Sequence, residues 1–358
     1  MKKHLILAIN PGSTSTKLAI YENENLVSEF KISHDTEKIM SYKRIIDQYD
    51  FREQVILEFL KKENVDLSKF SAIVGRGGML KPIESGTYQV TDDMVKDMYE
   101  AKRGEHASNL GCLLAKDLAD KHNIPSFVVD PVAVDEMDDH YRYTGFPELQ
   151  RSSLFHALNH KAVARRRAKD LRRKYEDCNF IIAHLGGGIS VAAHEKGKVI
   201  DVNNALDGDG PMSPERSGSL PAGPLYKLVF SGKYTLDEIK RKNYGKGGMV
   251  AYLGTNDGRE IMEMIEKGDE KAKFIFEVMC YQIAKEIGSE ATVLKGHVDE
   301  IILTGGLAYN KLLVDLVKER VEFIAPVIVY AGENEMESLA LGALRVLQGE
   351  EKPKVYKS

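Results

Sequence analysis

A hydroxyl-rich turn between two apolar segments is the first place where this sequence could do chemistry. The apolar run Leu5–Ile9 breaks at Asn10-Pro11-Gly12 and resumes at Leu18–Tyr21, which predicts a β-hairpin. The turn offers hydroxyl and amide donors, the Lys17 cation and backbone N–H groups that Gly12 leaves accessible, and this combination is suited to phosphate. The same residues also fit an ordinary Ser/Thr-rich surface turn. A Walker-type loop is excluded, because Lys17 lacks the second glycine before it and a strand follows instead of a helix.

A second segment, Phe180–Val202, repeats this plan. An apolar run ends at His184, a glycine turn follows at Gly186-Gly187-Gly188, and a second apolar run and a Lys-Gly turn lead into a third strand. The first copy also continues into a third strand, at Leu26–Ile32. Two strand-turn-strand-turn-strand units predict an internal duplication, with two related halves that face one nucleotide.

Charged residues and a third glycine turn stand at the ends of other predicted strands. Arg76 follows one apolar segment and is flanked by glycines, Asp130 follows another, and Gly305-Gly306 follow a third. In open α/β sheets the ligand contacts gather at the carboxyl ends of the strands. Predicted helices alternate with these strands, so we expect the α/β class, with mixed sheets and helices on their faces.

The length of 358 residues suits two domains of ordinary size, and the polar segment Thr144–Glu148, broken by Gly and Pro, is the first credible boundary. We expect a first domain of residues 1–145 plus 331–358, with the last helix returning to it, and a second, nucleotide-binding domain of residues 146–330. Near the chain end, Asn334 and Glu337 predict a capping box before a helix over Ser338–Leu347.

The composition favours a cytoplasmic protein. The net charge of −4 provides no overall basic field for nucleic acid or an anionic membrane. The three cysteines are far apart and read as buried thiols in a reducing compartment. The apolar run after Met1-Lys2-Lys3 is too short for a signal peptide, and no segment approaches the roughly 18 apolar residues of a membrane span.

Two features invite other interpretations. The strongly basic segment Ser152–Tyr175 is conceivable as a nucleic-acid site, but its apolar stripe favours a solvated outer helix face. His156 and His160 have the spacing of a zinc pair, yet the sequence between them lacks the Glu of H-E-x-x-H and no cysteine is near, so a zinc site is disfavoured. His160 fits better as a residue facing the core or a neighbouring carboxylate.

The three glycine turns in two repeated halves resemble the phosphate and adenosine motifs of the ASKHA superfamily, which contains acetate kinase, sugar kinases, Hsp70 and actin. Within it, nearly the whole chain is similar in order to the acetate and butyrate kinase family. The matching motifs are Asn10-Pro11-Gly12-Ser13-Thr14-Ser15, Arg76 after a strand, Asp130 after the next strand, Phe155-His156 with His160, His184 to Ser190, and Arg216-Ser217-Gly218.

This resemblance implies two ASKHA domains, each with a mixed sheet of five-stranded type, and an active-site cleft between them. It also implies a reversible, ATP-dependent and Mg²⁺-dependent transfer of phosphoryl to the carboxylate of a short-chain fatty acid, giving an acyl phosphate, by a homo-oligomer. The residues expected to bind the nucleotide are Asn10, Gly12, Ser13, Ser15, Lys17, Gly186, Gly187, Gly188, Gly305, Gly306 and Asn310.

The chain also departs from acetate kinases. Gly187 stands where they generally carry Asn, so a backbone contact must replace one side-chain contact to the nucleotide phosphates. Their adenosine motif Gly-Ile-Gly-Glu-Asn is here Gly305 to Asn310 with a different sequence. The segments Gly75–Pro82 and Gly332–Leu339, and the shorter length, look like butyrate kinases, which implies butyrate or a branched relative as the acid.

The expected catalytic groups follow from charge, because a carboxylate and a γ-phosphoryl group must approach each other while negative charge spreads over the oxygens. Arg76 and Arg216 suit bidentate contacts to these anions, and His156 and His184 are suited to donating hydrogen bonds to the same oxygens. No general base is needed, because a carboxylic acid is already ionised at pH 7. As a simpler role, Arg76 also fits a surface salt bridge.

For the metal, Asp130 and Glu337 are expected to hold Mg²⁺ directly or through its waters, with Asn10 ordering that shell. Glu337 would alternatively serve only as a helix cap. Three other activities remain open: an acetate or propionate kinase, a sugar kinase with Asp130 as its base, and a non-enzymatic ATPase of the Hsp70 or actin kind. The last two leave the pair Arg76 and Arg216 without a role.

Overall fold

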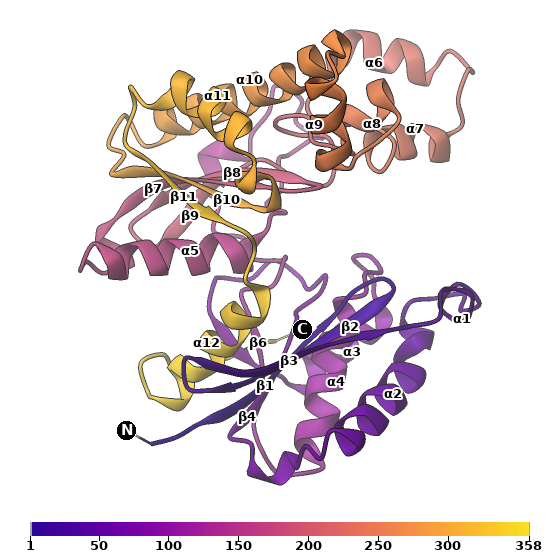
Figure 1. Ribbon diagram of the computed structural model, residues 1–358, viewed down its shortest axis with the longest axis vertical. Helices are drawn as coiled ribbons and strands as arrows, with labels where there is room; N and C mark the ends of the chain where they lie inside the picture. Colours follow the sequence, from indigo (N-terminus) through magenta and orange to yellow (C-terminus); the bar gives the residue numbers. More distant parts are fainter. Residues whose placement is uncertain (1, 358) are drawn as a thin grey trace. The chain divides into compact units, whose positions relative to one another are not determined.

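The computed structural model describes residues 2–357, which form two compact units (Figure 1). Unit 1 contains the described residues up to Val134 together with those from Asn334 onward, and unit 2 spans Asp135–Glu333. The domain limits that we expected, near residues 145 and 331, differ somewhat from these divisions. None of the helices in the described part of the chain is long and apolar enough to cross a membrane.

Unit 1 is built on a seven-stranded mixed sheet in the order β12-β5-β6-β4-β1-β2-β3. Its strands are β1 Leu5–Pro11, β2 Ser15–Glu22, β3 Asn25–Ser33, β4 Ala72–Gly75, β5 Thr87–Gln89, β6 Ser126–Val129 and β12 Lys354–Val355. Its α-helices are α1 Thr36–Met40, α2 Tyr49–Lys62, α3 Asp92–Glu100, α4 Asn109–Asp120 and α12 Glu335–Leu347. Helix α4 covers one face of the sheet, and α12, returning from the chain end, covers the other (Figure 1).

Unit 2 is built on a five-stranded mixed sheet in the order β11-β10-β7-β8-β9. Its strands are β7 Asn179–Leu185, β8 Ile189–Glu195, β9 Lys198–Val202, β10 Glu300–Gly305 and β11 Val327–Ala331. Its α-helices are α5 Ala157–Asp170, α6 Ala222–Val229, α7 Leu236–Asn243, α8 Gly248–Leu253, α9 Gly258–Glu266, α10 Glu270–Val293 and α11 Lys311–Val321. Helices α10 and α11 pack on one face of the sheet and α5 packs on the other, so both faces are buried (Figure 1).

The two sheets share one topology, as the repeated sequence plan predicted. In both, a long hairpin is followed by a third antiparallel strand, and two further strands add in parallel on the other side, giving β6-β4-β1-β2-β3 and β11-β10-β7-β8-β9. The pairing also shifts at the same place, between Ile20 and Tyr21 and between Ala193 and His194. A β-bulge repeated at equivalent positions is a strong sign of duplication. The α/β fold with two mixed sheets and flanking helices is therefore confirmed.

The start of α12 differs from the expectation. The helix begins at Glu335, one turn earlier than predicted, and Asn334 precedes it with a left-handed φ of 42° and no side-chain capping bond. The predicted capping box with Glu337 is therefore wrong. Asn tolerates the left-handed region better than most residues, which explains how the chain enters the helix here. The earlier start matters because it changes which carboxylates project from the first turn.

The basic segment around α5 is largely neutralised within unit 2. Arg167 forms a bidentate ion pair with Glu300, and Arg173 pairs with Asp299. Lys161, which we expected on a solvated face, is instead fully buried and paired with Glu136. Acidic neighbours within unit 2 therefore compensate the charges of these three cations.

Candidate functional site

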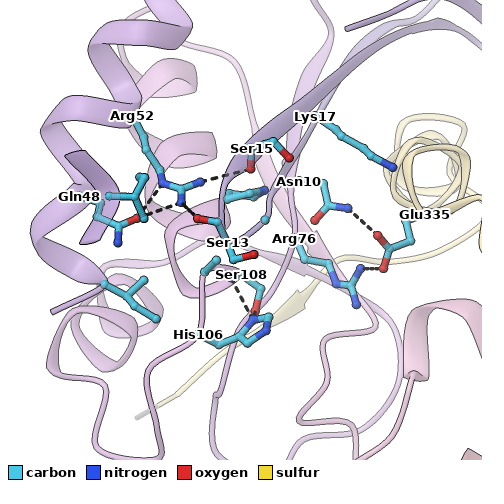
Figure 2. A pocket seen from close by; sticks show the side chains of 15 residues that line it. Asn10, Ser13, Ser15, Lys17, Gln48, Arg52, Arg76, His106, Ser108 and Glu335 are labelled. Atoms are coloured by element: carbon cyan, nitrogen blue, oxygen red, sulfur yellow. Dashed lines mark hydrogen bonds and ion pairs between the residues drawn. The ribbon is translucent and has the colours of Figure 1, made fainter. Parts of the chain in front are cut away.

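The hydroxyl-rich turn of unit 1 lines a cavity of about 510 Å³ (Figure 2). The turn connects β1 to β2, and the Gly12 N–H donates to the Ser15 carbonyl at 2.7 Å, which closes it tightly. Residues 39–52, the loops after β4 and before α4, and the first residue of α12 supply the remaining walls. The cavity is lined by Asn10, Pro11, Gly12, Ser13, Ser15, Lys17, Ile39, Ile45, Gln48, Arg52, Arg76, His106, Ala107, Ser108 and Glu335.

Arg76 reaches this cavity because close packing fixes the loop that carries it. Its backbone N–H donates to the Ile9 carbonyl at 2.9 Å and so extends the pairing of β4 with β1. A Cβ on Gly77 would overlap the side chains of Val128 and Pro131. Glycine is therefore required there for the loop to approach β6. The Arg76 guanidinium is mostly buried and pairs with Glu335.

Glu335 is a member of this cluster that the sequence analysis missed. Its Oε1 pairs with Arg76 and its Oε2 accepts a 2.6 Å hydrogen bond from the Asn10 side-chain amide (Figure 2). One carboxylate thus joins the turn to the strand-end arginine. Three carboxylates stand close together in the sequence, and the misplaced helix start directed attention to Glu337 instead of Glu335.

Arg52 of α2 is the second residue that sequence reasoning missed. It is fully buried, and its guanidinium donates to the backbone carbonyls of Ser13 at 2.9 Å and Ser15 at 3.3 Å (Figure 2). The guanidinium also donates to Thr16 Oγ1 and Gln48 Oε1, which are uncharged as well. Burial lowers the pKa of Arg52 to about 10. This cation therefore fixes the carbonyls of the turn and is also one of the residues that line the cavity.

In unit 2 the histidines His156 and His184 are stacked, with ring centroids 3.8 Å apart and an interplanar angle of 12°. His184 lies at the end of β7, and His156 precedes the first residue of α5. His184 Nδ1 is 2.8 Å from Asn159 Oδ1, and its Nε2 is 3.5 Å from Glu333 Oε1. Helix α5 therefore holds both rings at the edge of the sheet.

A buried hydrogen-bond chain supports His156 from behind. Ser190 Oγ lies 2.9 Å from both His156 Nδ1 and His160 Nε2. The chain continues from His160 Nδ1 to His194 Nε2 at 3.2 Å. It ends with His194 Nδ1, which lies 2.7 Å from the Tyr175 hydroxyl. Burial holds the pKa of His160 and His194 well below the usual range, so both are neutral at pH 7. His160 is thus a core residue, and the described part of the chain contains no metal-type cluster of His, Cys, Asp or Glu.

The glycine turn of unit 2 leaves space for the side chain of Arg216. The Gly186 N–H donates to the Gly188 carbonyl at 3.1 Å, and a Cβ on Gly188 would overlap the Arg216 guanidinium. That guanidinium also donates to the Ala205 carbonyl. Burial lowers the pKa of Arg216, although an arginine keeps its charge at neutral pH. The glycines therefore allow a cation to lie directly against the turn.

The chain was also compared with known protein families and solved structures. The sequence profile of the Acetokinase family matches residues 148–335. The chain belongs to the acetokinase family. The match covers all of the second hairpin, the loop that carries Arg216 and the first residue of α12.

Solved structures of acetate and propionate kinases share the fold of this chain over nearly all of its length. An acetate kinase from Porphyromonas gingivalis is 22% identical, with a TM-score of 0.79 over 96% of this chain and 100% of that one. A propionate kinase from Francisella tularensis is 21% identical, with a TM-score of 0.72 over 95% and 98%. An acetate kinase from Entamoeba histolytica is 16% identical, with a TM-score of 0.74 over 98% and 99%.

The two carboxylates expected at the metal, Asp130 and Glu337, lie outside the cavity of unit 1. Asp130 is buried, has a φ of 37°, and accepts hydrogen bonds from Ser85 Oγ at 2.6 Å and Gly86 N–H at 2.7 Å. The pKa of Tyr21 is raised to about 12, first by burial and then by the charge of Glu337. Their roles at a metal stay predictions.

The third glycine turn has a clear structural reason. Gly305 has a φ of 87°, and a Cβ there would overlap the Leu185 backbone at the end of the neighbouring β7. Asn310 caps α11, with its Oδ1 accepting from the Leu313 N–H at 3.1 Å. Both residues are accounted for by the fold, and a nucleotide contact for them stays a prediction.

Proposed function

We propose that the protein transfers the γ-phosphoryl group of ATP to the carboxylate of a short-chain fatty acid, reversibly, with butyrate or a branched relative as the preferred acid. Membership of the acetokinase family supports the reaction class. The observation that carries the proposal is the cavity of unit 1, in which Lys17, Arg52 and Arg76 accompany hydroxyl groups and a glycine turn. Cations with hydroxyl and backbone donors are the chemistry expected for an anionic substrate or phosphate.

In this proposal the arginines do most of the catalytic work. Arg76 and Arg216 bind carboxylate and phosphoryl oxygens through their planar forks and stabilise the charge that spreads over the transferred group. His156 and His184 donate hydrogen bonds to the same oxygens. No proton has to leave the acid, because its carboxylate is already the nucleophile at pH 7.

The oxygen donors beside the hydroxyl-rich turn suit Mg²⁺, which prefers carboxylate and amide oxygens and keeps several waters. Asn10 and Glu335 are hydrogen-bonded to each other there, and Asp130 and Glu337 are the candidates from the sequence. When bound, the metal neutralises phosphate charge and orients the nucleotide. The hydrogen bond between Asn10 and Glu335 holds the side-chain oxygens that would face Mg²⁺ or its waters.

For the acid preference, we propose that apolar side chains of the segment after Arg76, such as Met79, Leu80 and Ile83, form part of the wall around the alkyl chain. Leu80 is only 3% exposed and belongs to the core of unit 1, whereas Met79 and Ile83 are half-buried. A wall built from such side chains gains about 0.8 kcal/mol for each methylene it buries. Neighbouring chain lengths should therefore still react, at reduced efficiency.

The test is hydroxamate formation with ATP, Mg²⁺, hydroxylamine and straight-chain acids of two to six carbons, with isobutyrate and a sugar in parallel. We expect kcat/KM to be highest at four carbons, lower at three and five, and much lower for acetate. A maximum at acetate or propionate would replace the butyrate assignment by the activity named for the solved neighbours. ADP production with the sugar and none with any acid would overturn the carboxylate-kinase proposal itself.

We also propose that the protein works in the cytoplasm, where ATP and short-chain acids are available, and as a homo-oligomer. Sedimentation equilibrium of the purified protein tests the second point directly. A monomer at all concentrations would contradict it and leave the reaction unaffected.

A further inference from the structure

The two stacked histidines differ in what the structure says about their protons. Asn159, a buried residue of α5, lies between His184 and the backbone of Glu333. Its Nδ2 donates to the Glu333 carbonyl at 3.1 Å, and its Oδ1 lies 2.8 Å from His184 Nδ1. The carbonyl of Glu333 can only accept, so the amide group of Asn159 has one possible orientation.

This orientation fixes the proton on His184. An amide oxygen can only accept a hydrogen bond, so His184 Nδ1 must carry a hydrogen and donate it to Asn159. A neutral imidazole has one N–H, and in His184 Nδ1 uses it. The Nε2 of neutral His184 therefore has a lone pair and no hydrogen. It donates from Nε2 only as an imidazolium.

The surroundings of His184 are compatible with one positive charge. The Glu333 carboxylate lies 3.5 Å from Nε2, so an oxygen of opposite charge faces this nitrogen. On α5, His160 is kept neutral by burial, and His156 is stacked on the ring. On the glycine turn after β7, Arg216 lies against Gly188 and Glu215 lies beside Gly187, which adds one charge of each sign.

We infer that His184 acts as an imidazolium whose Nε2–H donates to the transferred phosphoryl oxygens, and that Asn159 is the positioning residue that holds Nδ1–H away from them. This inference rests on the proposed phosphoryl transfer. It gives Asn159 a specific role that a structural side chain would not have. The inference also predicts how activity depends on pH. The protein should be active while His184 is protonated and lose activity as His184 loses its proton.

The first test determines which ring nitrogen of His184 carries a proton, and it needs no activity assay. In protein labelled with ¹⁵N-histidine, long-range ¹⁵N–¹H correlation spectra distinguish Nδ1–H, Nε2–H and doubly protonated rings, and His184→Gln assigns the signal. At high pH we expect His184 to be the Nδ1–H form, and at lower pH we expect both nitrogens to be protonated. An Nε2–H form of neutral His184 would overturn the inference, even if the carboxylate kinase activity is found.

The second test is the pH profile of kcat with butyrate above pH 7, where the acid is ionised throughout. Asn159→Asp keeps the acceptor for Nδ1–H and adds a negative charge, which stabilises the imidazolium, so the alkaline loss of activity should move upward by about one pH unit. Asn159→Ala removes the acceptor, so it should reduce kcat and should not move the loss upward. Asn123→Asp, in the exposed turn after α4, is the control for the change in net charge.

The outcomes are distinct. An upward shift in Asn159→Asp alone supports the inference. Equal profiles in wild type, Asn159→Asp and Asn123→Asp, with normal folding, would overturn it. Absence of any acyl hydroxamate from the wild-type protein would instead refute the proposed function, and the proton state of His184 would still be decided by the spectra.

Discussion

Equivalent positions in the two units carry different chemistry. Both hairpins have seven paired positions, and the sixth pair is Asn10 with Lys17 in unit 1 and His184 with Ser190 in unit 2. On the neighbouring parallel strand, the same count makes Arg76 of unit 1 equivalent in register to Thr304 of unit 2. One strand-end scaffold thus presents an amide and two cations in unit 1 and an imidazole and two hydroxyls in unit 2.

The cation of unit 2 comes from another source. Arg216 lies in the long segment between β9 and α6, and the glycine turn leaves space for it where a Cβ would not. In unit 1 the arginine follows a strand directly, and the two glycines after it let the loop pack against β6 and against Asn109 of α4. After duplication, the same scaffold has therefore acquired a positive charge in two different ways. The proposed reaction between two anions requires such positive charge.

The largest expected effect tests whether the two positive charges serve one reaction. Arg76→Lys and Arg216→Lys keep the charge but lose the planar fork, so kcat should fall by a similar factor in each, about 10² to 10³. The affinity for ATP, measured by calorimetry, should change much less. A loss of ATP affinity as large as the loss of kcat in one variant would assign that arginine to the nucleotide and break the proposed equivalence.

The next effect concerns the turn that accommodates Arg216. Gly188→Ala places a methyl group where the guanidinium now lies, so the arginine must move, and we expect kcat to fall by about tenfold to a hundredfold. Gly288→Ala in α10 is the matched control, because its added methyl group meets no atom within 4 Å. Full activity in Gly188→Ala would show that Arg216 is not needed at this turn.

A smaller effect concerns the buried cation of unit 1. Arg52→Met leaves the Ser13 and Ser15 carbonyls without their donor, which should lower the free energy of unfolding by about 1–3 kcal/mol in urea titrations. Arg103→Met, at a half-exposed arginine, should cost less. If Arg52→Met is as stable as wild type, the cost of burying the guanidinium equals the gain from its hydrogen bonds.

The sequence was sufficient to predict the two repeated hairpins, because both alternate apolar runs with glycine turns. Arg52 was not predictable, because it lies on an amphipathic helix and reaches the turn only through tertiary packing. Glu335 was missed because the start of α12 depends on Asn334 adopting a left-handed conformation, which the sequence only permits. The role of Asn159 depends on which neighbours its amide contacts.

The smallest effect is a pH dependence of stability that comes from a buried histidine of unit 2. Burial keeps the pKa of His194 in unit 2 well below its usual range, so the folded state binds fewer protons than the unfolded chain, and stability falls as the pH drops below about 6.5. His194→Gln should remove about 1.4 kcal/mol of this loss for each pH unit. Comparing wild type with the variant at pH 7 and 5.5 cancels the opposing contribution of Glu290, whose pKa burial raises.

The control for this experiment is His140→Gln, because the His140 side chain is 91% exposed. Its unfolding free energy should follow the wild-type pH dependence. A His194→Gln variant with the same pH dependence as wild type would show that folding does not lower the pKa of His194, contrary to its burial.

The account depends most directly on the product of the reaction. Purified protein incubated with ATP, Mg²⁺ and butyrate should produce, in ³¹P NMR spectra, ADP together with an acyl phosphate resonance, and ADP with butyryl phosphate should regenerate ATP. Arg76→Lys and Arg216→Lys should both slow the two directions. Inorganic phosphate as the only phosphorus product besides ADP, with no acyl phosphate at any time and no reverse reaction, would contradict the account.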